Sequence, residues 1–235
     1  MKLKNNIFFG LTLIVIILLS AFAHKQNKRR KIGSISINFK SDGPKFLSPS
    51  FVNKLLIQNI GELSSETKDS LDLSRLETLL ENTPYILNAE AFCFPEGTLG
   101  INILEKKPLV MIRGDNTYYL DNFGTEFPIS ESYSPLVPVF VGELNSFDKK
   151  NLLALVNFFN KDPFLKSELK TIYHKSSSFF VGLRSYDFQV EIGSISKTSD
   201  KLLKLKVFCA YQDNNELEKK YKLISLKYKN QIVGS

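Results

Sequence analysis

Hydrophobic and polar residues follow three different patterns along this chain of 235 residues. Residues 7–23 are apolar and uncharged, residues 32–107 mix strand-like and helix-like periods, and residues 108–235 contain mostly short alternating runs. Alternation of apolar and polar positions is typical of half-buried strands, whereas apolar residues three and four positions apart are typical of helices. We therefore expect one apolar helix followed by two domains that combine helices with strands.

The apolar run at residues 7–23 would extend about 25 Å as a helix, near the short end of what crosses a bilayer. We predict a transmembrane helix there, preceded by a short tail, residues 1–6. The end of the run, Ala21-Phe22-Ala23, also fits a signal-peptide cleavage site, so a removed leader is the alternative to a retained anchor. Retention is favoured because the run exceeds a usual signal core and a basic juxtamembrane linker, residues 24–31, follows it.

Positive charge is concentrated near the N-terminus. Residues 1–31 carry seven Lys or Arg and no Asp or Glu, which leaves 24 basic and 24 acidic residues in the remainder. This balance gives no reason to expect a nucleic-acid partner. The basic residues of the linker outnumber Lys2 and Lys4, so charge counting alone points the large domains toward the cytosol.

The first domain is predicted at residues 32–107. It begins with an alternating strand at residues 32–39, continues with two helices at about 49–60 and 72–82, and ends in a hairpin within residues 83–108. The order strand, helix, helix, strand, strand indicates an α+β arrangement, with both helices on one face of a small sheet.

The second domain, residues 108–235, is predicted as a mixed β-sheet with flanking helices. We expect helices at residues 147–160 and 200–211. Strands are expected at residues 109–113, 117–121, 126–129, 137–141, 171–174, 178–183 and 188–192. At residues 221–233, alternate apolar positions predict one last strand with a buried face.

The residues that could carry chemistry give no catalytic, cofactor or metal-binding pattern. His174 is the one histidine away from the predicted membrane boundary, and no nucleophile or carboxylate is placed by spacing to form a triad with it. Cys93 and Cys209 lie 116 positions apart, which is no zinc spacing. We take both as core residues, with an extracytoplasmic disulfide as the alternative. We predict no enzyme, no cofactor and no small-molecule substrate.

Surface for binding remains. If the last strand lies at a sheet edge, a partner could pair with its backbone and extend the sheet. Lys227 and Lys229 could instead prevent such pairing, because lysines on an edge strand oppose the addition of another strand. The pattern alone leaves both interpretations open.

Four motifs in this order resemble those of the bacterial cell-division family FtsQ/DivIB, particularly its Bacteroidetes-type members. LSRLETLLENTPYILNAEAFCFPEGTLGINILEKKPLVMI resembles the second helix, hairpin and charged link of a POTRA domain. YYLDNFGTEFPIS, PLVPVFVGE and YKLISLKYKNQIV resemble a hairpin, a following strand and the closing strand of the family's β domain. Ser225, Lys227 and Ala91 depart from the usual Asp, Arg and Val.

The resemblance implies a non-enzymatic scaffold of the divisome, with a single pass through the inner membrane, a cytoplasmic N-terminus and periplasmic domains. This placement goes against the charge count. It also implies FtsB/DivIC-like and FtsL-like partners that pair with the closing strand. Matching positions give the partner-binding candidates Leu226, Lys227, Tyr228, Lys229 and Gln231.

POTRA domains also occur in periplasmic chaperones and docking proteins of outer-membrane protein assembly, which is the alternative function. Such domains normally come in series ahead of a barrel, and no barrel-length set of amphipathic strands follows here. An unrelated lipid-interacting surface protein is a further alternative. We therefore expect a division scaffold.

Overall fold

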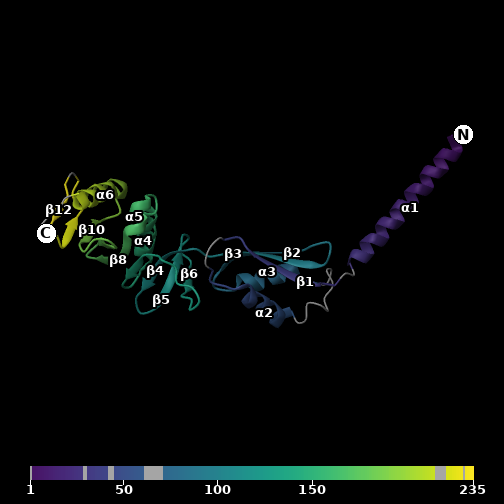
Figure 1. Cartoon of the computed structure of the whole chain (residues 1–235), viewed down its shortest axis with the longest axis horizontal. Helices are drawn as coiled ribbons and strands as arrows, with labels where there is room; N and C mark the ends of the chain where they lie inside the picture. The colour runs from purple at the N-terminus through teal and green to yellow at the C-terminus, as the bar shows by residue number, and fades with distance from the viewer. Residues whose placement is uncertain (1, 29–30, 42–44, 61–70, 215–220, 230) are drawn as a thin grey trace. The chain divides into compact units, whose positions relative to one another are not determined.

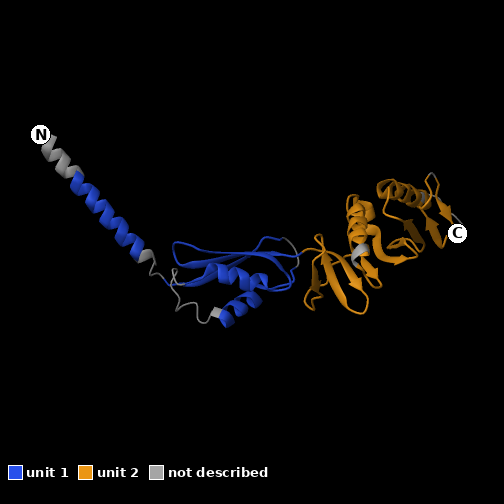
Figure 2. Cartoon of the chain, turned by 180° about the vertical axis from the view of Figure 1, so that it is seen from behind, with its two compact units in different colours: residues 1–106 blue, residues 107–235 orange. Residues whose placement is uncertain are grey.

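The computed structural model describes residues 2–28, 31–41, 45–60, 71–214, 221–229 and 231–235. The chain forms two compact units, Met1–Lys106 and Lys107–Ser235 (Figure 2). Both combine helices with sheets that contain parallel and antiparallel pairs, so the fold class is α+β.

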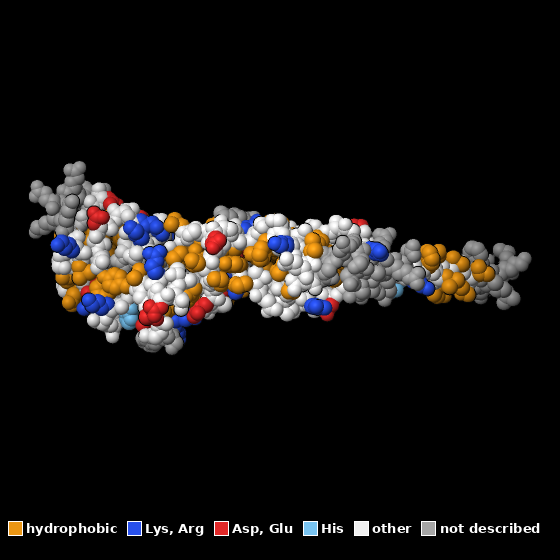
Figure 3. Space-filling view, turned by 90° about the horizontal axis from the view of Figure 1, so that it is seen from below, with side chains coloured by type: hydrophobic (Ala, Val, Ile, Leu, Met, Phe, Trp, Pro, Cys, Tyr) orange, Lys and Arg blue, Asp and Glu red, His pale blue; other side chains and the backbone are white. Residues whose placement is uncertain are grey.

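Helix α1 (Lys2–Lys28) contains the run that we predict to cross a membrane, and that prediction is wrong. Within the part of the chain that the structure describes, no helix combines the length and the apolar character needed for a membrane span. The predicted run of residues 7–23 would extend only about 25 Å, against about 30 Å for the hydrocarbon core of a bilayer. The described apolar side chains of α1 are exposed (Figure 3), for example Leu11 at 62% and Phe22 at 66%.

The rest of the first unit contains the elements in the predicted order (Figure 1). They are β1 (Ser34–Phe39), α2 (Pro49–Ile60), α3 (Leu73–Glu81), β2 (Ile86–Cys93) and β3 (Thr98–Glu105). The strand order is β1-β3-β2, with β1 parallel and β2 antiparallel to the central strand. Whether this arrangement is a POTRA domain stays a prediction.

Capping side chains begin α2 and α3. The hydroxyl of Ser48 accepts a hydrogen bond from the Phe51 backbone at 3.1 Å, and the carboxylate of Asp72 accepts one from Arg75 at 3.0 Å. Helix α2 packs against β1 and α3 against β2, and the central strand β3 contributes the buried row Leu99, Ile101 and Ile103. Gly61, which we predict to end the first helix, lies outside the described residues.

The second unit is built on a nine-stranded sheet in the order β12-β11-β10-β9-β8-β7-β4-β5-β6. In chain order, the first six strands of this sheet are β4 (Pro108–Arg113), β5 (Thr117–Asp121), β6 (Glu126–Pro128), β7 (Val139–Val141), β8 (Leu169–Lys175) and β9 (Ser178–Leu183). The last three are β10 (Gln189–Gly193), β11 (Leu223–Ser225) and β12 (Val233–Gly234). The chain therefore ends at one edge of this sheet.

Three helices accompany the sheet: α4 (Ser146–Phe159), α5 (Pro163–Glu168) and α6 (Thr198–Asn214). The fully buried Leu155, Phe159 and Leu205 of α4 and α6 join the strands in one hydrophobic core. Helix α5 is absent from the sequence prediction. It has only six residues, and it begins with Asp162 as its N-cap and Pro163 in its first turn.

The predicted last strand at residues 221–233 is wrong as a single element. Strand β11 ends at Ser225, and the chain returns as β12, antiparallel to β11. Ile224 lies opposite Gly234, and Ser225 lies opposite Val233. The edge of the sheet is therefore β12, and β11 lies inside it.

Candidate functional site

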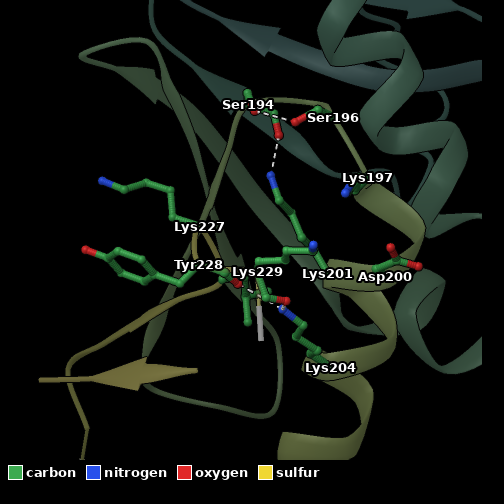
Figure 4. A pocket seen from close by; sticks show the side chains of 10 residues that line it. Ser194, Ser196, Lys197, Asp200, Lys201, Lys204, Lys227, Tyr228 and Lys229 are labelled. Atoms are coloured by element: carbon green, nitrogen blue, oxygen red, sulfur yellow. Dashed lines mark hydrogen bonds between the residues drawn. The ribbon is translucent and has the colours of Figure 1, made fainter. Parts of the chain in front are cut away.

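The five predicted partner-binding residues lie between β11 and β12. Leu226 is fully buried, whereas Lys227, Tyr228, Lys229 and Gln231 are exposed. Leu226 to Lys229 border a cavity of about 310 Å³ at the beginning of α6 (Figure 4). The remaining lining residues are Ser194, Ser196, Lys197, Asp200, Lys201 and Lys204. The structure therefore brings the beginning of α6 next to the predicted residues, and the sequence does not predict this contribution of α6.

Glu191 of β10 holds the beginning of this segment. Its carboxylate accepts hydrogen bonds from the Ser225 hydroxyl at 2.8 Å and from Lys227 Nζ at 3.1 Å. Its backbone carbonyl accepts a bond from the Leu226 N–H at 2.9 Å, which extends the parallel β10–β11 pairing by one residue. Burial opposes ionisation of Glu191, but the bonds from Ser225 and Lys227 outweigh it and lower the pKa of this carboxyl.

Lys204 of α6 holds the other end of the segment. Its Nζ donates to the backbone carbonyl of Tyr228 at 2.9 Å and to that of Lys229 at 2.5 Å. These two carbonyls therefore already have a donor. Figure 4 shows Lys227 and Tyr228 projecting to one side, away from α6, where a partner can reach them.

The chain leading into α6 closes the far side of the cavity. Lys201 is only 8% exposed and donates from Nζ to the Ser194 carbonyl at 2.7 Å. Burial, together with the charge of Lys204, lowers the pKa of Lys201. Gly193 has φ +73°, and a Cβ there would lie 2.9 Å from Cγ of Lys227, so the close approach of the two segments needs glycine.

Five lysines and one aspartate line this cavity, which makes it a basic site. Lys197, Lys201, Lys204, Lys227 and Lys229 provide the positive charge, and Asp200 is the acidic residue. A hollow of one sign of charge raises the local concentration of groups with the opposite sign. The site is therefore suited to acidic side chains of a partner.

The sheet edge beside the basic site has open backbone groups. Leu223 and Ser235 exchange both backbone hydrogen bonds, at 3.1 and 2.9 Å. Because such pairs alternate along an antiparallel ladder, the N–H and C=O of the intervening Gly234 point away from β11. Among the described residues no strand pairs with β12 on that outer side. A partner strand can therefore add there.

The histidine and the cysteines considered in the sequence analysis are packed among other residues of the fold. His174 stacks on Phe179 with 4.6 Å between ring centroids, and its Nδ1 lies 3.2 Å from the carboxylate of Asp148 in the first turn of α4. Cys209 lies fully buried in the core of the second unit, whereas Cys93 of β2 is only half-buried, so the core prediction is wrong for Cys93. Among the described residues, no three His, Cys, Asp or Glu side chains are grouped to hold a metal ion.

A basic cavity and an open strand edge lie in the same unit, an arrangement that can accept an extended acidic segment. The family model "FtsQ/DivIB, C-terminal related" matches residues 107–235, which is more than half of the chain and all of the second unit. The chain therefore belongs to the FtsQ/DivIB family, as the sequence motifs indicate. This is a family of non-catalytic cell-division proteins.

No curated protein matches the chain. Among solved structures, the chain is similar to the major extracytoplasmic domain of the cell-division protein DivIB from Geobacillus stearothermophilus, in its trans isomer. The identity is 17%, the match covers 47% of this chain and 97% of the other, and the TM-score is 0.34.

Proposed function

We propose that the chain is a non-enzymatic scaffold of the bacterial division machinery and binds its partners at the C-terminal edge of the second unit. The observation that carries this proposal is the position of the open β12 edge next to the basic site. Family membership supports the division role. FtsB/DivIC-like and FtsL-like proteins are the proposed partners, and both units are proposed to act outside the cytoplasm.

The proposed mode of binding is strand addition. An extended partner segment pairs with β12 through the outward N–H and C=O of Gly234 and thereby lengthens the sheet by one strand. Acidic side chains of the same segment then approach the exposed Lys229 and Lys197. Backbone pairing contributes affinity, and the charges contribute orientation and association rate.

The five predicted residues take different parts in this mode. Leu226 is buried and Lys227 is bound to Glu191, so these two hold the segment in place. Tyr228 is 47% exposed and offers an aromatic ring to the partner. Lys229 and Gln231 are also exposed and offer polar groups. Aromatic residues at the centre of an interface often carry much of its binding energy.

Complementation tests the proposal in cells. Depletion of the chain should give long undivided cells, and Tyr228→Ala combined with Lys229→Glu should fail to restore normal cell length. The matched control is Lys170→Glu, which makes the same charge change at an exposed position of β8. Normal division with the double variant would contradict the proposed site. Loss of outer-membrane proteins without a division defect would instead support the chaperone alternative.

A further inference from the structure

The three-stranded sheet of the first unit has two edges, β1 and β2. The β2 edge is closed by side chains of α3. The carboxylate of Glu77 accepts a hydrogen bond from the Ala91 N–H at 2.8 Å, and that of Glu81 accepts one from the Ala89 N–H at 3.2 Å. Two backbone donors that a further strand would need are therefore already bound.

The β1 edge lacks this protection. Its sequence, Ser34–Phe39 (SISINF), contains no charge and no proline, and its pairing with β3 has no register shift. Natural edge strands usually carry charges, prolines or bulges that prevent further pairing. Among the described residues, no strand pairs with the outer side of β1. Side chains therefore close the β2 edge of this sheet, whereas the β1 edge is open.

The apolar face of β1 is only partly covered, by α2 and by the Lys45 ammonium, which lies 5.0 Å from the centre of the Phe39 ring. Ile35, Ile37 and Phe39 are half-buried, whereas their neighbours on β3 are at most 1% exposed. On the other face, Ser34 bonds to Thr98 at 3.0 Å and Asn38 to Asn102 at 3.3 Å. These polar bonds run toward β3 and leave the outer edge open.

We propose that β1 pairs antiparallel with β1 of a second copy of this chain, about a two-fold axis at Ile37. This register places Ile35 opposite Phe39 and Ser36 opposite Asn38, so apolar residues meet apolar ones and polar residues meet polar ones. A one-residue slip would place isoleucines opposite serine or asparagine. The strand has no charge that would repel its own copy, and a two-fold interface uses the same surface twice.

The contact is small, because six residues of strand extend about 20 Å. We therefore expect dimers that form at high local concentration and separate on dilution. The two open edges lie in different units, β1 in the first and β12 in the second. The dimer inference does not depend on the proposed function, and its failure would leave the β12 site untouched.

Disulfide capture in the full chain tests the register. Two differently tagged copies, Ser36→Cys and Asn38→Cys, each with Cys93→Ser, are mixed and oxidised. The yield of the mixed disulfide dimer should exceed the yield obtained with Glu90→Cys in place of one of these two variants. Glu90→Cys is the control, because it places a thiol on the same face of the sheet at the other edge strand. Capture no greater than with Glu90→Cys would overturn the proposal.

Sedimentation of the full chain provides the second measurement. Ile37→Lys places two like charges opposite each other at the axis and should keep the chain monomeric at concentrations where the parent dimerises. Ile37→Thr keeps a β-branched, uncharged side chain and should retain dimers. Both variants are first checked for folding by circular dichroism. Equal dimerisation of Ile37→Lys and the parent chain would also overturn the proposal.

Discussion

The carboxylate of Glu191 on β10 accepts a hydrogen bond from Nζ of Lys227 at 3.1 Å. The side chain of Glu191 is only 12% exposed, whereas that of Lys227 is 48% exposed. The bond therefore joins a carboxylate of the sheet to a residue that we predict to contact a partner. It fixes the direction in which the chain leaves β11.

The Glu191 contact should make stability depend on pH. The pKa of Glu191 is lowered from 4.5, so its contribution is present above the unfolded pKa and is lost as the pH falls through the lower folded pKa. Urea unfolding of the parent and of Glu191→Gln should show a gap at pH 7 that narrows below about pH 4.5. A gap that widens on acidification would contradict the lowered pKa.

Lys204 should hold the segment before β12. Lys204→Met removes the donor to the Tyr228 and Lys229 carbonyls, and we expect the free energy of unfolding to fall by about 1 kcal/mol. Lys222→Met is the control, because it removes an exposed lysine of the same unit. Equal stability of the two variants in urea would show that the two bonds contribute nothing.

Cys209 should react slowly with thiol reagents in the folded protein. Burial raises its pKa to about 11, and the thiolate is the reactive form. In Cys93→Ser, modification by an aromatic disulfide at pH 8 should be slow and become fast when urea is added. Rapid modification without urea would show that the core of the second unit opens readily.

Glu77 should keep the β2 edge closed. Glu77→Ala leaves the Ala91 N–H without its acceptor and should lower the free energy of unfolding of the first unit by about 1 kcal/mol. It should also increase self-association, because an edge strand is then exposed. Glu77→Gln keeps an acceptor oxygen and should behave like the parent. If Glu77→Ala and Glu77→Gln had the same free energy of unfolding and the same self-association by light scattering, this role would be contradicted.

Local patterns predict most of the elements. β5 (Thr117–Asp121) has the predicted bounds because its alternation ends at a turn that Asp121 itself stabilises. The carboxylate of Asp121 accepts backbone bonds from Phe123 and Thr125 at 2.9 and 2.8 Å. Turn chemistry of this kind is local, so the sequence alone reveals it.

Tertiary contacts explain the failure at the last strand. Apolar and polar residues alternate from Ile224 to Lys229, so the period gives no sign that the strand ends at Ser225. The chain turns because Lys204, more than 20 positions away, holds the Tyr228 and Lys229 carbonyls. The basic site is missed for the same reason, since its lysines come from α6 and from the segment after β11.

Photo-crosslinking in cells tests the central claim most directly. A probe at Lys229 lies at the rim of the basic site, and a control probe at Phe123 lies at an 81% exposed position of the β5–β6 turn in the same unit. We expect the probe at Lys229, but not the probe at Phe123, to capture a short coiled-coil division protein, and Tyr228→Ala to reduce the yield. Capture of that protein from Phe123 alone would contradict the proposed site.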